Sequence, residues 1–335
     1  MDNETISTYD IIARSFKVKD IASPILWSIT PDKTRTEIWD EIIPDLDIKF
    51  DWFLEPCIVR DDKKIYGYLF GDSEIFQVEE EGCVGDNLEL FTPDILVPSS
   101  MPIIDLFPIF EKENYLFVLT KNDITHFISF SNLNRLPVQM CIFSLIMKFE
   151  SEIVRYYNHK QPHYLFRNLP ENILYKALKL CLRNEIDMRK SKYQKMSKYV
   201  EKAPNGPTKD FAKMIQRENE QLEEFLKKKE LRYSTFEECL DDICLISVYD
   251  VLDNFTLYDR IELIKIDNEL FSKLPFESEE KFYEYFKKLR KVRNEIAHSG
   301  SIFKFLENPK EFNIFIRKLQ EINNKLSELL GREMH

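Results

Sequence analysis

The sequence predicts an α+β N-terminal half, built from small sheets with helices, followed by an all-α helical bundle. Short runs of aromatic and β-branched residues, separated by tight turns, lie within the first 136 residues. From residue 137 onward, apolar residues recur at the three- and four-residue spacing of helices. Glycine is scarce, with 7 in 335 residues, which favours helices over turn-rich β folds. A chain of this length usually holds two domains, so we expect one at 1–136 and a second at 137–335.

The first half contains the same strand–turn–strand pattern twice. We expect the first copy at 52–60, 61–64 and 65–70, and the second at 115–119, 120–123 and 124–130. A short helix is predicted at 131–135, directly after the second copy. Because the pattern returns after roughly 50–60 residues, the sequence indicates duplication of one small unit.

Two segments of this half carry a family resemblance. They are Gly67-Tyr-Leu-Phe-Gly-Asp72-Ser73 and His126-Phe-Ile-Ser129-Phe-Ser-Asn132. Over about residues 16–137 the chain resembles a pair of CBS modules, with His126 where that family usually has Gly and Asn132 where it usually has Asp. The resemblance implies an adenine nucleotide as a regulatory ligand between the modules, held by Asp72 or Ser73 in the first and by Ser129 and Asn132 in the second. A structural dimerisation module is the alternative that the residues leave open.

The second half is expected to be almost wholly helical. Pro137 suits the first turn of a helix, so we place the first long helix there. Further helices are predicted at 173–188, at 211–231, from the Thr235–Glu238 capping box to about 249, at 279–298 and at 309–330. A loop with two prolines and one glycine is expected at 199–207. Ser278 is placed to cap the start of the helix at 279–298, and Ser299-Gly300 to end it.

The end of that helix carries the residues with the clearest chemistry. Arg293 carries a permanently charged guanidinium group with several hydrogen-bond donors, and His298 carries an imidazole, the side-chain type that titrates near neutral pH. With Asn294 they resemble the Arg-Asn-x-x-x-His signature of HEPN domains, many of which are ribonucleases. The resemblance implies that His298 acts as general base or acid on the RNA 2′-hydroxyl or the leaving 5′-oxygen. Arg293 would clamp the scissile phosphate and Asn294 would orient the His or hold a phosphate oxygen.

Other interpretations of these residues stay open. A helix-end His beside a surface Arg is often without any chemical role. Arg183-Asn-Glu-Ile repeats part of the motif, but Met188 stands where the His would be, so we predict an ordinary helix surface there. On one straight helix, Arg293 and His298 point roughly 140° apart, whereas Asn294 and His298 share a face. A bend at Ser299-Gly300 or a second copy of the helix would bring them together. HEPN nucleases typically build their cleft at a dimer interface, so the resemblance favours the second copy.

Charge is distributed unevenly along the chain. The net charge is −11, and residues 1–140 hold 26 acidic and 12 basic residues, against 32 and 35 in the remainder. An acidic first half would repel a phosphate backbone, whereas the second half tolerates one. The segment 281–293 has six Lys or Arg residues and one acidic residue, Glu284, and it lies on the same predicted helix as the motif. Taken alone, such a run most often forms a solvated helix face.

Several classes of protein are disfavoured by the sequence. No apolar run reaches the roughly 18–20 residues of a membrane span, and the acidic, polar N-terminus is unlike a secretory signal. Six scattered cysteines without CxxC spacing indicate buried free thiols in a reducing cytoplasm. His159 and His163 have the spacing of metal ligands, but Pro162 breaks the helix that would align them, so no metal site is predicted.

The combined expectation is a cytoplasmic homodimer whose N-terminal CBS-like pair regulates or assembles a C-terminal HEPN bundle. The bundle would be a metal-independent endoribonuclease acting on RNA, as in toxin or anti-phage defence proteins, with no cofactor in catalysis. An antitoxin or another protein would be a further partner of such an enzyme. The alternative is a catalytically silent HEPN/CBS protein that senses a nucleotide or binds a protein partner.

Overall fold

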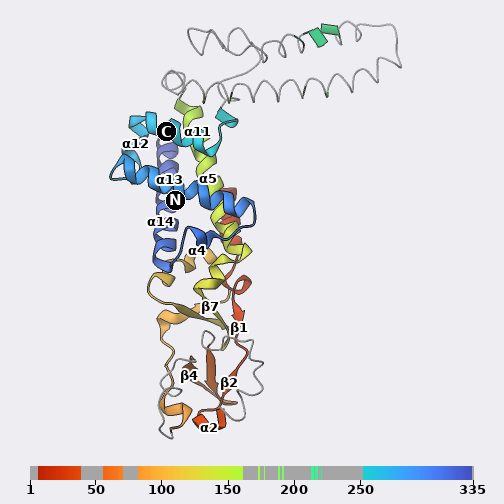
Figure 1. The fold of residues 1–335 in the computed structure, drawn as a ribbon, viewed down its shortest axis with the longest axis vertical. Coiled ribbons are helices and arrows are strands. Elements are labelled where there is room, and N and C mark those ends of the chain that lie inside the picture. Colours follow the sequence, from red (N-terminus) through yellow and green to blue (C-terminus); the bar gives the residue numbers. More distant parts are fainter. Residues whose placement is uncertain are drawn as a thin grey trace, which may run out of the picture. The chain divides into compact units, whose positions relative to one another are not determined.

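The structure is a computed structural model that describes residues 7–38, 56–70, 82–160 and 252–333, with single positions between 173 and 220 (Figure 1). It has an N-terminal α/β part with small mixed sheets and a C-terminal helical region, as predicted. The chain divides into two compact units, Met1–Lys148 with Lys291–Gln320, and Phe149–Arg290 with Glu321–His335. This division is based on packing, and the domain limits 1–136 and 137–335 stay a prediction.

Two small sheets form the α/β part. The three-stranded sheet has the order β2 (Ser28–Ile29), β3 (Cys57–Arg60), β4 (Ile65–Leu69), and the four-stranded sheet has the order β1 (Ser23–Pro24), β7 (Asp123–Ser129), β6 (Tyr115–Thr120), β5 (Leu96–Pro98). In each sheet a short strand lies parallel to the first strand of an antiparallel hairpin. The hairpin strands start at Cys57 and Ile65 in one sheet, and 58 residues later, at Tyr115 and Asp123, in the other. Both predicted strand–turn–strand segments are therefore confirmed.

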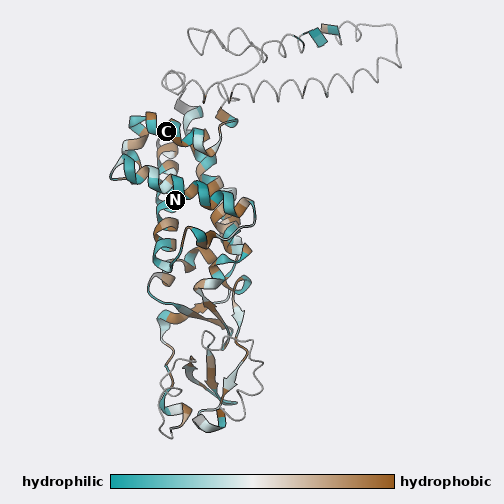
Figure 2. Cartoon of the chain, viewed as in Figure 1, coloured by the Kyte–Doolittle hydropathy of each residue, from teal (hydrophilic) through white to brown (hydrophobic). Residues whose placement is uncertain are grey.

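Aromatic rings fill the space between facing sides of the two sheets. Tyr68 of β4 lies 4.5 Å from Phe117 of β6 between ring centroids, and Phe91 contacts both rings. These residues belong to one buried cluster that includes Ile58 and Phe127. A second cluster joins β2, β3 and β4 to neighbouring segments through Ile29, Ile38, Val59, Leu69 and Val84. Figure 2 shows brown, hydrophobic segments on the strands of the two sheets, and the burial of the two clusters stabilises these short strands.

Gly67 is required by the close approach of another segment to β4. Tyr68 and Glu89 exchange two backbone hydrogen bonds of 2.9 Å each, which bring the backbone of Glu89 over the strand. A Cβ atom at residue 67 would overlap the Glu89 carbonyl oxygen and the Leu88 side chain. Only a residue without a side chain fits this crossing.

We therefore expect Gly67→Ala to lower the free energy of unfolding by about 1–3 kcal/mol, because the clash is with backbone that cannot rotate away. Gly331→Ala is the matched control, since nothing lies within 4 Å of its Cβ position. This control should be neutral or slightly stabilising, by at most about 1 kcal/mol, through helix propensity. Urea unfolding followed by circular dichroism measures both, and equal midpoints for the two variants would contradict the prediction.

The described parts of the chain contain helices of three to 25 residues. They are α1 (Thr8–Ser15), α2 (Arg35–Glu37), α4 (Ile103–Leu106), α5 (Leu136–Lys160), α11 (Leu257–Ile266), α12 (Asn268–Lys273), α13 (Glu279–Ala297) and α14 (Pro309–Glu333). Short 3₁₀ turns lie at Val18–Asp20, Val84–Asp86, Pro93–Ile95, Ile109–Glu111, Phe130–Asn134 (η7) and Ile302–Lys304 (η8). The predicted short helix after the second hairpin is thus the 3₁₀ turn η7.

The long helices compare closely with the prediction. Helix α5 starts one residue before Pro137, α13 ends at Ala297, and α14 runs three residues beyond the predicted end at 330. The Ser278 hydroxyl accepts the Lys281 N–H at 3.3 Å, as expected for the cap of α13. Helices α11 and α12 were not predicted, although Thr256 and Asp259 form a capping box at the start of α11.

Several predictions lie outside the described residues. They are the strand start at 52–55, most of the helices at 173–188 and 211–231, the helix from 235 to 249, the loop at 199–207, the Arg183 segment up to Asp187, and residues Asp72, Ser73 and His163. Among the described residues, none of the helices combines the length and apolar character needed to cross a membrane.

Candidate functional site

Arg293 and Asn294 lie in the last two turns of α13, and His298 is the residue directly after its end. Val292 and Ile296 are buried, Arg293 is half-buried, and Asn294 and His298 are exposed. The Nε atom of Arg293 is buried, so part of its guanidinium group lies inside the protein. Asn294 and His298, which helical spacing predicts to share a face, are thus both exposed, and the buried Val292 and Ile296 mark the side of the helix that faces the core.

The helix ends in a Schellman motif directly after His298. The His298 N–H still donates to the Asn294 carbonyl at 3.1 Å, as in a continuing helix. Ser299 then adopts a left-handed φ of 55°, and the Gly300 N–H donates to the Glu295 carbonyl at 2.7 Å. Because the reversal starts after His298, it does not turn His298 toward Arg293. Within one chain the two side chains keep their divergence of roughly 140°.

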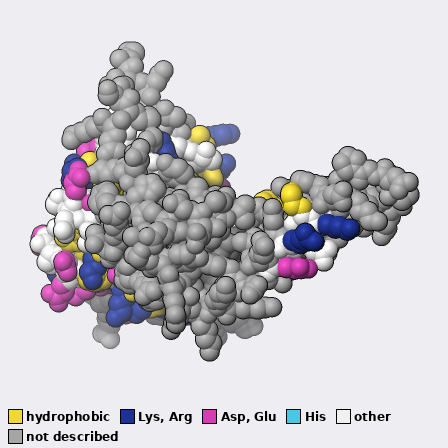
Figure 3. Space-filling model, turned by 90° about the horizontal axis from the view of Figure 1, so that it is seen from above, with side chains coloured by type: hydrophobic (Ala, Val, Ile, Leu, Met, Phe, Trp, Pro, Cys, Tyr) yellow, Lys and Arg dark blue, Asp and Glu magenta, His cyan; other side chains and the backbone are white. Residues whose placement is uncertain are grey.

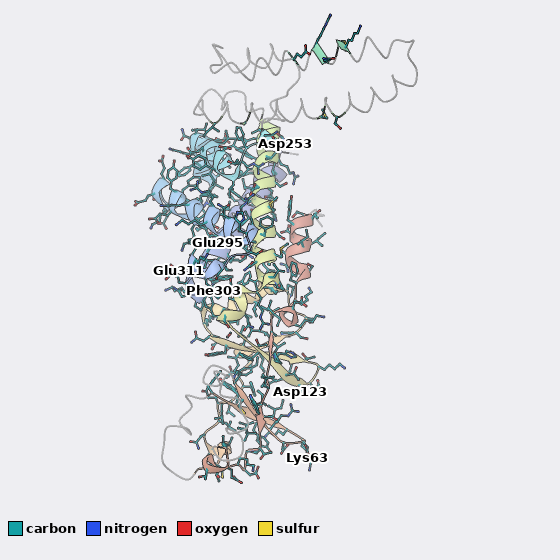
Figure 4. The ribbon with its side chains drawn as sticks, turned by 45° about the vertical axis from the view of Figure 1, so that its right-hand side comes forward. Lys63, Asp123, Asp253, Glu295, Phe303 and Glu311 are labelled. Atoms are coloured by element: carbon teal, nitrogen blue, oxygen red, sulfur yellow. The ribbon has the colours of Figure 1, made fainter. Side chains whose placement is uncertain are left out.

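Positive charge lies beside the open face. Lys291, one helical turn before Asn294 and on the same face, has its ammonium 5.1 Å from the centroid of the Phe305 ring. Lys304 forms an exposed ion pair of 3.1 Å with Glu295, which is labelled in Figure 4. Exposed pairs of this kind add little stability, and both lysines remain near enough to the surface to meet a phosphate.

The basic run at 281–293 does not form a continuous positive face. Lys287, Arg290 and Lys291 are exposed, whereas Lys288 and Arg293 are half-buried. Arg290 lies over the Tyr258 ring at 5.5 Å, and Lys281 pairs with Glu284 at 3.1 Å. Among the described residues that Figure 3 shows from above, Lys and Arg side chains lie next to Asp and Glu side chains. Long-range attraction of RNA is therefore weaker than the sequence run alone implies.

The segment after the motif is anchored to the end of the second hairpin. The Gly300 carbonyl accepts a hydrogen bond from Gln139 Nε2 at 3.2 Å, and Asn134 Oδ1 accepts the Ile302 N–H at 3.2 Å. The Phe303 ring stacks on Phe130 of η7 with centroids 4.5 Å apart and planes 16° apart. Neither Asn134 nor Gln139 was predicted, because each lies more than 160 positions from its partner and no local signal marks it.

Ser129 and Asn132 form a capping box at the start of η7. Asn132 is 3% exposed; its Oδ1 accepts the Ser129 N–H at 2.8 Å, and its Nδ2 donates to the Ile21 carbonyl at 2.9 Å and to Ser23 Oγ at 3.0 Å. The Ser129 hydroxyl also donates to Asn132 Oδ1 at 3.0 Å, so these bonds occupy both amide donors and both acceptor positions of the side chain. Here Asn132 joins η7 to the segment before β1, and a ribose contact would require it to exchange these partners. The predicted nucleotide role of Ser129 and Asn132 stays a prediction.

A metal site was not expected from the sequence. In the parts of the chain that the structure describes, no group of three or more His, Cys, Asp or Glu side chains is placed to hold a metal ion. His163 lies outside those parts, so the expectation about His159 and His163 also stays a prediction.

The comparisons with known proteins found no match: no family model, no curated protein and no solved structure matches the chain. Function is therefore inferred from the residues of this chain and from their arrangement.

Two of the described cysteines have unreactive surroundings. Burial raises the pKa of the Cys141 thiol to about 12, and this thiol lies 3.5 Å from the Ala13 carbonyl oxygen. Burial also raises the pKa of Cys57, at the start of β3, to about 12. A thiol with such a pKa is a structural group and a poor nucleophile at neutral pH.

We expect iodoacetamide at pH 8 to label Cys57 and Cys141 very slowly in the folded protein and rapidly in urea. The thiolate fraction is about one in 10⁴ for a pKa near 12 and about one in four for an unfolded thiol, so the rates should differ by about 10³-fold. Peptide mass spectrometry measures each cysteine separately. Labelling at the same rate with and without urea would show that the folded protein does not raise the pKa of these two thiols.

Proposed function

We propose that this protein is a metal-independent endoribonuclease of the HEPN type that acts as a homodimer. The observation that carries the proposal is the arrangement at the end of α13, where Asn294 and His298 are exposed on one face and half-buried Arg293 lies beside them. This arrangement presents a titratable imidazole, an amide and a permanent cation over six residues, which are the groups needed for phosphodiester cleavage.

The chemistry follows from these residue types. A neutral His298 takes the proton of the RNA 2′-hydroxyl, and the 2′-oxygen attacks the adjacent phosphorus. The bond from phosphorus to the 5′-oxygen breaks, that oxygen takes a proton from water, and His298 then releases its proton to the solvent. Arg293 stabilises the negative charge that builds on the phosphate oxygens. The products are a 2′,3′-cyclic phosphate and a 5′-hydroxyl, and no metal ion takes part.

The dimer is proposed because one chain does not direct its groups to one point. Arg293 and His298 diverge by roughly 140° on a helix that stays regular up to His298. Two copies related by a twofold axis can each contribute one of these groups to the same phosphate. Such a pair of chains would hold two equivalent sites.

The N-terminal α/β part is proposed as the regulatory or assembling half of a toxin or anti-phage defence effector in the cytoplasm. The duplicated strand pattern, with a parallel strand beside each hairpin, supports a CBS-like pair. An adenine nucleotide is the ligand that this likeness suggests, and an antitoxin is a partner that such an effector would have. The aromatic packing between the sheets and the bonded state of Asn132 favour a structural role over nucleotide binding.

A catalytically silent sensor or protein-interaction module is the second candidate. It is favoured by the partial burial of Arg293, because a guanidinium that packs along the protein can serve structure alone. A silent protein would bind a nucleotide or a protein without cleaving RNA.

The deciding experiment is incubation of the full chain with total RNA in EDTA, with and without adenine nucleotides, followed by mapping of fragment ends. Fragments ending in a 2′,3′-cyclic phosphate are expected. RNA that remains intact in every condition, together with nucleotide-induced thermal stabilisation, would support the silent sensor instead.

A further inference from the structure

The turn that follows His298 is held by a corner of the α/β part. That corner consists of η7 and the first turn of α5, and it contacts Gly300, Ser301, Ile302 and Phe303 in succession. All of these residues belong to the same compact unit, which also includes both sheets. The motif end of α13 and the second hairpin are therefore packed together, although the sequence assigns them to different halves.

Two side chains make the polar part of this contact. Asn134 Oδ1 accepts hydrogen bonds from the Ile302 N–H at 3.2 Å and from Ser301 Oγ at 3.3 Å. Buried Gln139 donates from Nε2 to the Gly300 carbonyl at 3.2 Å and to the Asn134 carbonyl at 3.0 Å. Asn134 and Gln139 thus connect the corner to residues 299–303, the exit turn of α13, through these hydrogen bonds.

The exit turn needs this external support. Ser299 holds a left-handed φ of 55°, which costs energy for any residue with a side chain. Backbone hydrogen bonds within the Schellman motif offset part of that cost, and the bonds to Asn134 and Gln139 hold the chain immediately beyond it. His298 is the residue directly before the strained position, so the direction of its side chain depends on how firmly this turn is held.

We propose that Asn134 and Gln139 are positioning residues, which fix the exit turn of α13 and thereby the orientation of His298. The α/β part is then a structural component of the motif site. As far as catalysis is concerned, this inference rests on the proposed ribonuclease function; the effect on the turn itself does not.

The test uses hydrogen exchange in full-length variants. Asn134→Ala removes the acceptor for the Ile302 N–H, and exchange of the amides from 299 to 303 is expected to accelerate about tenfold. Asn134→Asp keeps a carboxylate acceptor at the same position and should restore slow exchange. Gln139→Ala removes a different bond to the same turn and should act in the same direction. Met140→Ala, on an exposed neighbour in α5, is the control and should leave this segment unchanged.

Activity supplies the second readout. If the full chain cleaves RNA, Asn134→Ala and Gln139→Ala should lower kcat about tenfold with little change in KM, and Asn134→Asp should recover most of it. Faster exchange in a chain that cleaves no RNA would support the role of these residues in the turn and refute the ribonuclease proposal. Unchanged exchange from 299 to 303 in both folded alanine variants would overturn the positioning role itself.

Discussion

Replacing His298 by alanine is expected to lower the rate of RNA cleavage by about 10²–10⁴-fold, the usual contribution of a positioned general acid or base. His298 is exposed and lies after the last residue of α13, so the substitution removes a reactive group without opening the core. Its backbone N–H bond to the Asn294 carbonyl does not involve the side chain and should persist. The loss should therefore appear in kcat, with the melting temperature almost unchanged.

A control on the same helix makes this result specific. Glu280→Ala alters an exposed side chain near the start of α13, far along the helix from the motif, and should retain wild-type cleavage. Expression in cells offers a second measurement, because growth inhibition by the wild-type chain should disappear with His298→Ala. Equal cleavage by the wild type and His298→Ala would refute the role of the motif.

Mixing two inactive variants is expected to restore activity if two chains share each site. Arg293→Ala retains His298, and His298→Ala retains Arg293, so a mixed dimer contains one site with both groups and one with neither. Random exchange of equal amounts makes half of the dimers mixed, which gives about one quarter of the wild-type number of sites. The regular helix up to His298 is the reason to expect sharing, because it keeps the two groups apart within one chain.

The measurement is cleavage of a labelled RNA after the two variants are mixed and allowed to exchange subunits. Each variant alone, at the same total concentration, provides the baseline. Co-expression with two different affinity tags isolates the mixed dimer directly. A mixed dimer that is as inactive as either parent would show that no site draws Arg293 and His298 from different chains.

Local patterns accounted for much of the fold. The hairpin strands β3 and β4, and β6 and β7, were predictable because alternating apolar residues and tight turns lie within a few positions of one another. The start and end of α13 were predictable for the same reason, since Ser278 and Ser299 act on the helix through neighbouring backbone groups. Strands β1, β2 and β5 have only two or three residues each, too few for any periodicity to show.

The predicted site residues also include some whose placement follows from the local sequence and others whose placement does not. Helical spacing alone indicated that Asn294 and His298 share one face, because the period of a helix is a local property, and both residues are exposed in the structure. By contrast, the use of Asn132 depends on the Ile21 carbonyl, 111 positions away, which local patterns do not reveal.

By itself, then, the sequence determined the secondary elements with strong local signals and the three residues on which the proposed chemistry depends, Arg293, Asn294 and His298. The tertiary structure alone decided that Asn134 and Gln139 hold the turn after His298, and that the aromatic residues of the two hairpins pack against one another. The physical reason is that these features arise from contacts between segments distant in the sequence, whose energies depend on how the folded chain brings them together.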